Sequence, residues 1–142
     1  MTFYLIMILL SYLQSSVMLS VFSHGLVVPD LVLCIYFLEL LKKEDRWGIK
    51  AIFSGAFLDI LQDSAGLYLS RQMIFCILYE LMSTKLQFPT KISKVIAYLS
   101  ISIVTKLFAI ILFSTKHKWE LNSVEFLAGI LIEALFIYRF CK

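Results

Sequence analysis

The stretch that decides the fold class is Phe3–Phe22, with the sequence FYLIMILLSYLQSSVMLSVF. None of its 20 residues is charged, and about 20 apolar residues suffice for an α-helix to cross the hydrocarbon core of a membrane. The stretch lacks the basic region and the small-residue cleavage site of a secretory signal, and a second apolar run follows almost at once. We therefore expect a first helix that stays in the membrane.

The whole chain has the same character. Its 142 residues are 61% hydrophobic and 16% charged, with a mean hydropathy of +0.89, whereas soluble domains are roughly half apolar and about a quarter charged. We predict a single all-α integral membrane domain over 1–142, a compact bundle of six transmembrane helices that leaves no room for a soluble catalytic or nucleic-acid-binding module. The apolar runs place these helices at about 3–22, 26–41, 47–61, 67–82, 93–113 and 121–140.

Basic residues predict the orientation of this bundle. Cytoplasmic loops of membrane proteins are enriched in Lys and Arg. If the N-terminus is cytoplasmic, the external loops contain only Lys116 and Lys118, and both termini lie inside. The cytoplasmic segments then contain nine basic residues: Lys42, Lys43, Arg46, Lys50, Lys85, Lys91, Lys94, Arg139 and Lys142.

Metal, cofactor and catalytic motifs are missing from the sequence. The three cysteines, Cys34, Cys76 and Cys141, are widely spaced, and no Cys-x-x-Cys pair occurs. His24 and His117 lie far apart in predicted turns. There is no glycine-rich phosphate loop and no hydrolase or metalloprotease signature. We expect no bound metal, no cofactor and no catalytic residues.

Ionisable residues inside predicted helices are costly and need partners. Asp59 lies four residues after Gly55 on the third predicted helix, so both are on one face. Asp30, Asp59 and Arg71 occupy one layer near the external side. We predict that Arg71 pairs with Asp59, Asp30 or both. Such a layer serves either to hold helices together or to bind a proton or substrate.

A second group of charges lies on the last two predicted helices. Lys106 is near the middle of the fifth, and Glu125, Gly129 and Glu133 form a four-residue stripe on the sixth. Lys106 falls between the two glutamates in depth. A Lys106–Glu133 or Lys106–Glu125 pair is therefore expected, and extension of Lys106 toward the interface is the alternative.

Polar residues also mark the first predicted helix. Ser11 and Ser15 share a face, and Gln14 borders it. A polar stripe on a helix without charge indicates a contact with another helix. That helix belongs either to the bundle itself or to a partner protein.

The region from Val28 to Ser70 carries a recognisable pattern. Pro29 and Asp30 open the second predicted helix, Gly55 and Asp59 lie on the third, and Gly66 follows it. This order resembles MreD, the rod shape-determining membrane protein family of bacteria, and the size and short loops are similar to that family too.

The resemblance implies a non-enzymatic scaffold of the cell-elongation machinery, which builds peptidoglycan at the bacterial cytoplasmic membrane. It implies binding to MreC and action with the MreB filament, with RodA and with its penicillin-binding transpeptidase. The five matching residues are carried over as structural positions. Membrane lipid is the other expected partner, and no nucleic acid is expected.

The alternative function is the substrate-binding membrane subunit of an energy-coupling-factor vitamin importer, which is also a compact six-helix protein. Such subunits usually present an alanine-x-x-x-alanine face on the first helix, where this chain has serines. The predicted outer turns at 23–25 and 62–66 are also too short to cover a ligand, which leaves 114–122 as the one candidate lid. A membrane enzyme would need a convergent nucleophile and base, and no histidine accompanies the predicted carboxylate–arginine layer.

Overall fold

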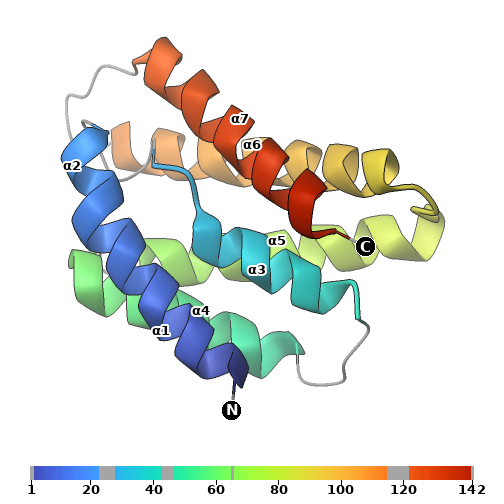
Figure 1. Ribbon diagram of the computed structural model, residues 1–142, viewed down its shortest axis with the longest axis horizontal. Coiled ribbons are helices and arrows are strands. Elements are labelled where there is room, and N and C mark those ends of the chain that lie inside the picture. Colours follow the sequence, from blue (N-terminus) through green and yellow to red (C-terminus); the bar gives the residue numbers. More distant parts are fainter. Residues whose placement is uncertain (1, 23–27, 43–46, 65, 115–121, 142) are drawn as a thin grey trace.

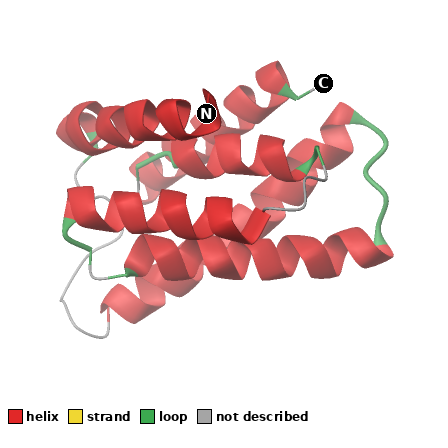
Figure 2. Ribbon diagram, turned by 90° about the horizontal axis from the view of Figure 1, so that it is seen from below, coloured by secondary structure: helices red, strands yellow, loops and turns green. Residues whose placement is uncertain are grey.

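The computed structural model describes residues 2–22, 28–42, 47–64, 66–114 and 122–141. Within these ranges the regular structure is helical and no strand occurs (Figure 2). The first three elements run on from one another, so the described chain forms six helical segments. Their bounds are α1 Thr2–Leu13, η1 Gln14–Met18, α2 Leu19–Val21, α3 Leu31–Leu40, α4 Trp47–Gln62, α5 Leu67–Lys85, α6 Lys91–Ser114 and α7 Ser123–Phe140.

The second helical segment, α3, is shorter than expected. A helix over 26–41 with Pro29 in its first turn was predicted, but α3 begins at Leu31 and Pro29 precedes it. The reason is Asp30, whose Oδ1 accepts a hydrogen bond from Leu33 N at 2.9 Å. A side chain that caps a helix in this way needs a non-helical backbone, and Asp30 has φ −87° and ψ 82°.

Helix α3 is the centre of the bundle (Figure 1). It packs against α1, α4 and α7, while α4 pairs with α5, α5 with α6, and α6 with α7. The ring of Phe37 on α3 lies 6.1 Å from that of Phe75, 5.5 Å from Tyr79 and 5.2 Å from Tyr98. This aromatic cluster joins the central helix to α5 and α6.

Helices α4 and α5 approach each other closely at Gly55. A Cβ atom added to Gly55 would lie 2.6 Å from the backbone Cα of Leu69, so any larger residue would push the two helices apart. Gly66 has φ +88°, a conformation that glycine adopts without strain. Both glycines of the motif therefore shape the α4–α5 hairpin.

The first helical segment contains a π-helical turn, η1. Two serine hydroxyl groups in this wider turn bond to the backbone. Ser15 Oγ and Ser16 Oγ donate to the carbonyl of Tyr12 at 3.1 and 2.6 Å. Gln14 points inward, and its Oε1 accepts from Val32 N at 3.4 Å.

This placement corrects one of the two readings of the polar stripe. Ser11 and Gln14 are fully buried, and Ser15 is half-buried. A protein partner therefore cannot reach Ser11 or Gln14 from outside, and the polar face of the first segment serves the interior of the bundle.

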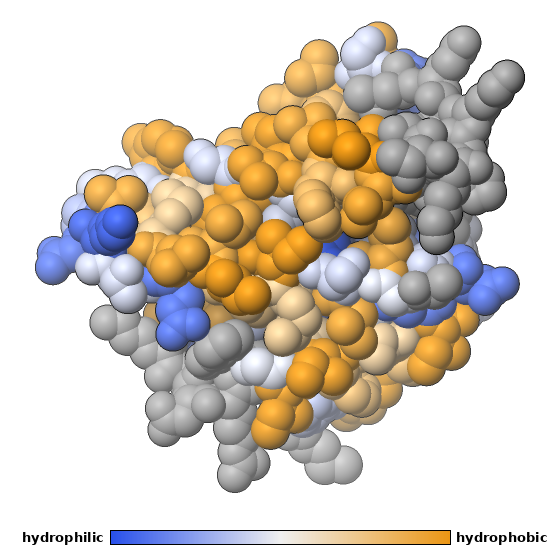
Figure 3. All heavy atoms as spheres, turned by 180° about the vertical axis from the view of Figure 1, so that it is seen from behind, coloured by the Kyte–Doolittle hydropathy of each residue, from blue (hydrophilic) through white to orange (hydrophobic). Residues whose placement is uncertain are grey.

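Large apolar side chains cover much of the outside of the molecule. Figure 3 shows one face on which they spread over the middle, while hydrophilic residues gather mainly toward the two ends of the long axis. Leu9, Ile60 and Leu135 are 66%, 77% and 69% exposed. Among the described residues, one helix segment, Lys91–Leu112, is both long and apolar enough to cross a membrane, with 22 residues and a mean hydropathy of 2.3.

Candidate functional site

Four charged side chains meet inside the bundle. Asp30, Arg71, Lys106 and Glu133 are each at most 1% exposed. They come from the N-cap of α3 and from α5, α6 and α7, so each belongs to a different part of the chain. Two are acidic and two are basic, and their formal charges cancel.

Glu133 is the centre of this charge network. Its Oε1 accepts from Lys106 Nζ at 2.5 Å and from the backbone N of Asp30 at 2.6 Å. Its Oε2 accepts from Ser102 Oγ at 2.9 Å and from Tyr98 OH at 3.1 Å. Both carboxylate oxygens therefore have two donors each, which is what a buried charge needs to be tolerated.

Asp30 connects the two ion pairs. Its Oδ2 forms a buried ion pair with Arg71 Nη2, its Oδ1 caps α3 through Leu33 N, and its own backbone N donates to Glu133. The result is an alternating row, Arg71–Asp30–Glu133–Lys106, that ties four helices together. In a low-dielectric interior such a row holds the helices in one register.

The structure brings together most of the expected pairs. Arg71 pairs with Asp30, and Lys106 pairs with Glu133 rather than extending to the interface. Glu125 lies at the start of α7, where its Oε1 accepts from Asn122 Nδ2 at 2.9 Å. Of the two glutamates on the predicted stripe, Glu133 is therefore the one that reaches Lys106.

Asp59 has a different role from the one expected. Its Oδ1 accepts from Tyr68 N and its Oδ2 from Leu69 N, both at 2.9 Å, and Ser64 Oγ also donates to it. The N-cap position of α5 is Gly66, which has no side chain to offer. Asp59 thus caps α5 from the neighbouring helix, and pairing between Asp59 and Arg71 is not part of the network.

Two members of the network were missed at the sequence level. Tyr98 and Ser102 precede Lys106 at intervals of four residues on α6, so all three share one helix face. That spacing is the signal that could have identified them. Cys34 on α3 adds a further contact, with its Sγ 3.2 Å from Tyr98 OH.

The carboxylate oxygens of the network are all engaged within the protein, while Arg71 Nε is buried without a hydrogen-bond partner in the described part of the chain. Each oxygen of Glu133 and Asp30 already accepts a hydrogen bond or an ion pair from the protein. Among the described residues, no group of three or more His, Cys, Asp or Glu side chains could hold a metal ion. The three cysteines are free thiols and all are buried.

Comparison with known protein families, with curated proteins and with solved structures finds no match for this chain. The five motif positions all lie at joints of the fold: Pro29 and Asp30 where α3 begins, and Gly55, Asp59 and Gly66 between α4 and α5.

Proposed function

We propose that this chain is an integral membrane protein whose six helical segments lie in a bacterial cytoplasmic membrane with both termini on the cytoplasmic side. The observation that carries the proposal is the inverted polarity of the molecule. Four charged side chains are buried and paired inside it, while large apolar side chains are exposed on α1, α4, α5, α6 and α7. A bundle surrounded by lipid is stabilised by this arrangement, because lipid solvates apolar groups and excludes charges.

Charged residues contribute to the weak appearance of α5 and α7 as membrane spans by composition alone. Arg71 and Glu133 lower the hydropathy of these two helices, but each is paired within the bundle. A paired and hydrogen-bonded ion costs far less at membrane depth than an isolated one. The described non-helical residues just before α3, 28–30, are also covered by protein, since Val28 and Asp30 are 1% and 0% exposed. Lipid-excluded backbone of this kind is tolerated within membranes.

Within this placement, the chain acts as a non-enzymatic scaffold similar to MreD. Its function is to bind MreC and to link it to the MreB filament, RodA and the penicillin-binding transpeptidase of the elongation machinery. The support is the motif from Pro29 to Gly66, whose residues act as caps and helix contacts. Residues in these roles fix how the helices pack against one another, and they supply no group that reacts with a substrate.

Co-purification with MreC tests the scaffold function. The full chain is expressed with MreC from the same genome and solubilised in mild detergent, and the expected result is a stable complex of the two proteins. The matched control is the Gly55→Leu variant, which disrupts the α4–α5 contact and is expected to lose MreC. Retention of an ATPase pair in place of MreC would favour the importer subunit and overturn the scaffold.

A cellular assay provides the second readout. In a rod-shaped bacterium depleted of its own MreD, this chain produced together with its cognate MreC is expected to restore rod shape. Round cells despite membrane insertion of both proteins would count against the proposed function.

A further inference from the structure

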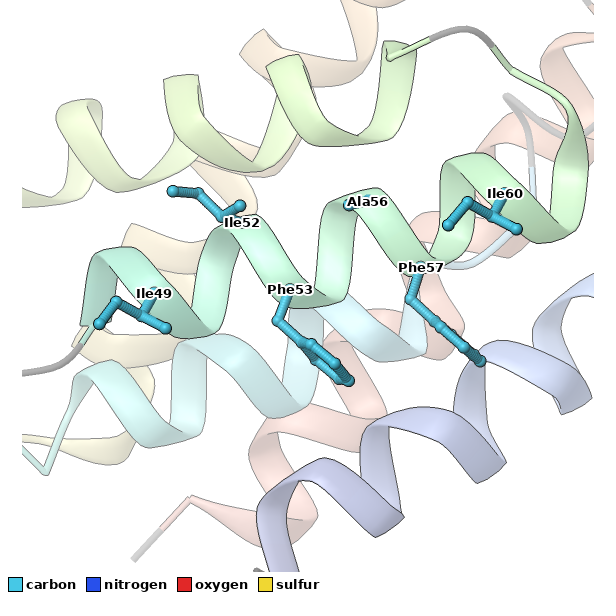
Figure 4. A pocket seen from close by; sticks show the side chains of 6 residues that line it. All are labelled: Ile49, Ile52, Phe53, Ala56, Phe57 and Ile60. Atoms are coloured by element: carbon cyan, nitrogen blue, oxygen red, sulfur yellow. The ribbon is translucent and has the colours of Figure 1, made fainter.

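The outer face of α4 carries an apolar groove (Figure 4). Its volume is about 430 Å³, and it is lined by Ile49, Ile52, Phe53, Ala56, Phe57 and Ile60. None of these side chains has a hydrogen-bond donor or acceptor. A polar ligand therefore finds no side-chain partner in this groove, and the unused hydrogen-bonding groups of the molecule lie inside the bundle instead.

Arg71 on α5 has a buried donor that the described protein leaves unused. Its side chain is 1% exposed, and Nη2 forms the ion pair with Asp30 Oδ2. Its Nε is buried and has no hydrogen-bond partner among the described residues. The guanidinium carbon lies 5.4 Å from the centre of the Tyr68 ring, but that ring supplies no lone pair. Because Nε–H can only donate and buried donors are nearly always paired, this group needs an acceptor.

A second unused donor comes from the first helical segment. Gln14 is fully buried, and its Oε1 accepts from Val32 N at 3.4 Å. Since a backbone N–H can only donate, this contact determines which end of the amide is the oxygen. The donor Nε2 is then the atom left buried with no partner in the described structure. Ser11 Oγ, three residues earlier on the same segment, is also buried and unpartnered there, and a hydroxyl group can donate or accept.

Both side chains reach the start of α3. Gln14 contacts Val32 and Arg71 contacts Asp30, which lies two residues earlier. Asp30 can also accept more than it does, because a carboxylate offers about four lone-pair positions, whereas the described bonds to it come from Leu33 N and Arg71. The first turn of α3 therefore combines buried donors that lack an acceptor with a carboxylate that can accept further bonds.

The balance of charge selects the ligand. The formal charges of Asp30, Arg71, Lys106 and Glu133 cancel in two ion pairs. A bound anion would add an uncompensated negative charge to this interior, which is costly. Water is neutral, accepts from unpaired donors and donates its own two protons to nearby acceptors. It therefore satisfies the unused groups and leaves the charge balance unchanged.

We propose that the first turn of α3 binds internal water, which accepts from Arg71 Nε and Gln14 Nε2 and donates to the carboxylate of Asp30. Water bound in this way is part of a protein structure. Here it extends the row of charges from α5 to η1, so that the first helical segment is joined to the network. Such binding depends on the packing of these helices and is independent of MreC.

Nuclear magnetic resonance of the full chain in detergent, with isotope-labelled arginine and glutamine, tests the proposal. The chain contains three arginines, so Arg46→Lys and Arg139→Lys variants assign the Nε–H signal of Arg71 by elimination. Magnetisation transfer from long-lived bound water is expected at Arg71 Nε–H and at the side-chain amide of Gln14. In the unchanged chain the exposed Arg139 is the internal reference for contact with bulk solvent.

A matched pair of variants locates the water. Gln14→Met removes one of the two donors at similar side-chain length, and the bound-water signal at Arg71 Nε–H should disappear. The control, Gln87→Met, changes an exposed glutamine after α5 and should leave that signal unchanged. Absence of both water signals in the unchanged chain, or a full Arg71 signal in a folded Gln14→Met variant, would overturn the proposal.

Exchange of the buffer anion distinguishes water from an anion. Replacing chloride by nitrate should leave the Arg71 Nε–H resonance where it is. A shift of that resonance without a water signal would reveal a bound anion, and the proposal would fail. Both water signals in a chain that does not bind MreC would support the internal water while the scaffold function failed.

Discussion

At the scale of single residues, Glu133 determines whether the buried charges are tolerated. It neutralises Lys106 and accepts from three further donors. Glu133→Gln would leave Lys106 as an uncompensated buried charge, and the free energy of unfolding should fall by about 3–5 kcal/mol. Denaturant titration of the purified protein in detergent, followed by circular dichroism, measures this change.

The matched control is Glu125→Gln, eight residues earlier on the same helix and only half-buried. It should change stability by no more than about 0.5 kcal/mol. Equal effects of the two substitutions would show that the buried charge network makes no specific contribution to the free energy of unfolding. A Glu133→Leu and Lys106→Met double variant should be more stable than Glu133→Gln, because it removes both charges at once.

The two glycines of α4 offer a second pair of substitutions with opposite expected signs. Gly55→Ala would bring a Cβ within 2.6 Å of the Leu69 backbone, and such overpacking typically costs about 1–3 kcal/mol. At Gly48 nothing lies within 4 Å of the added atom, so Gly48→Ala should stabilise the helix by about 0.5–1 kcal/mol. Thermal unfolding of both variants measures the difference, and a neutral Gly55→Ala would contradict the close packing of α4 on α5.

Residue spacing predicted which charged residues need a buried partner better than it predicted which residue each one pairs with. Depth along each helix placed Arg71 in one layer with both Asp30 and Asp59, and it could not decide between them. Depth is a coordinate along the helix axis, whereas pairing depends on which neighbouring helix each side chain faces. Tertiary packing turned Asp30 toward Arg71 and Asp59 toward the start of α5.

At the scale of elements, the α4–α5 hairpin depends on a cap supplied from outside the capped helix. Asp59→Ala removes the acceptor for Tyr68 N and Leu69 N, and loss of an N-cap costs about 0.5–2 kcal/mol. We expect faster hydrogen exchange at those two amides while the amides of α6 remain protected. The exposed Asp63 provides the control: it has φ +49°, a conformation that asparagine tolerates, so Asp63→Asn should leave exchange at those amides unchanged. Unchanged exchange at Tyr68 and Leu69 would refute the capping role.

Helix positions followed well from hydropathy, and helix ends less well. Five of the six expected runs agree with the described helices to within a few residues, while α3 begins at Leu31 and not near residue 26. An apolar run already includes Val28 and Pro29, so hydropathy alone gives no reason for the helix to begin only at Leu31. The start of α3 is set by hydrogen bonds to Asp30, which hydropathy does not detect.

At the scale of the whole molecule, the proposed topology predicts which loops each side of the membrane can reach. The three native cysteines are buried, so single introduced cysteines report their own position. A membrane-impermeant maleimide applied to intact cells should label a Ser123→Cys variant and leave a Gln87→Cys variant unlabelled until the membrane is opened. Both positions are exposed in the fold. Labelling of Gln87→Cys in intact cells would reverse the proposed orientation.

The amino-acid sequence by itself determined the helical class and the rough position of each helix, because apolar runs and their period are local properties. It also identified the charged residues that need partners, since any ionisable group within an apolar run is conspicuous. Only the tertiary structure decided that Glu133 is the centre of one row of alternating charges, that Gln14 and Ser11 face the interior, and that Asp59 caps a neighbouring helix. These outcomes depend on how the helices are rotated about their axes and packed together, and that arrangement is set by contacts between residues far apart in the chain.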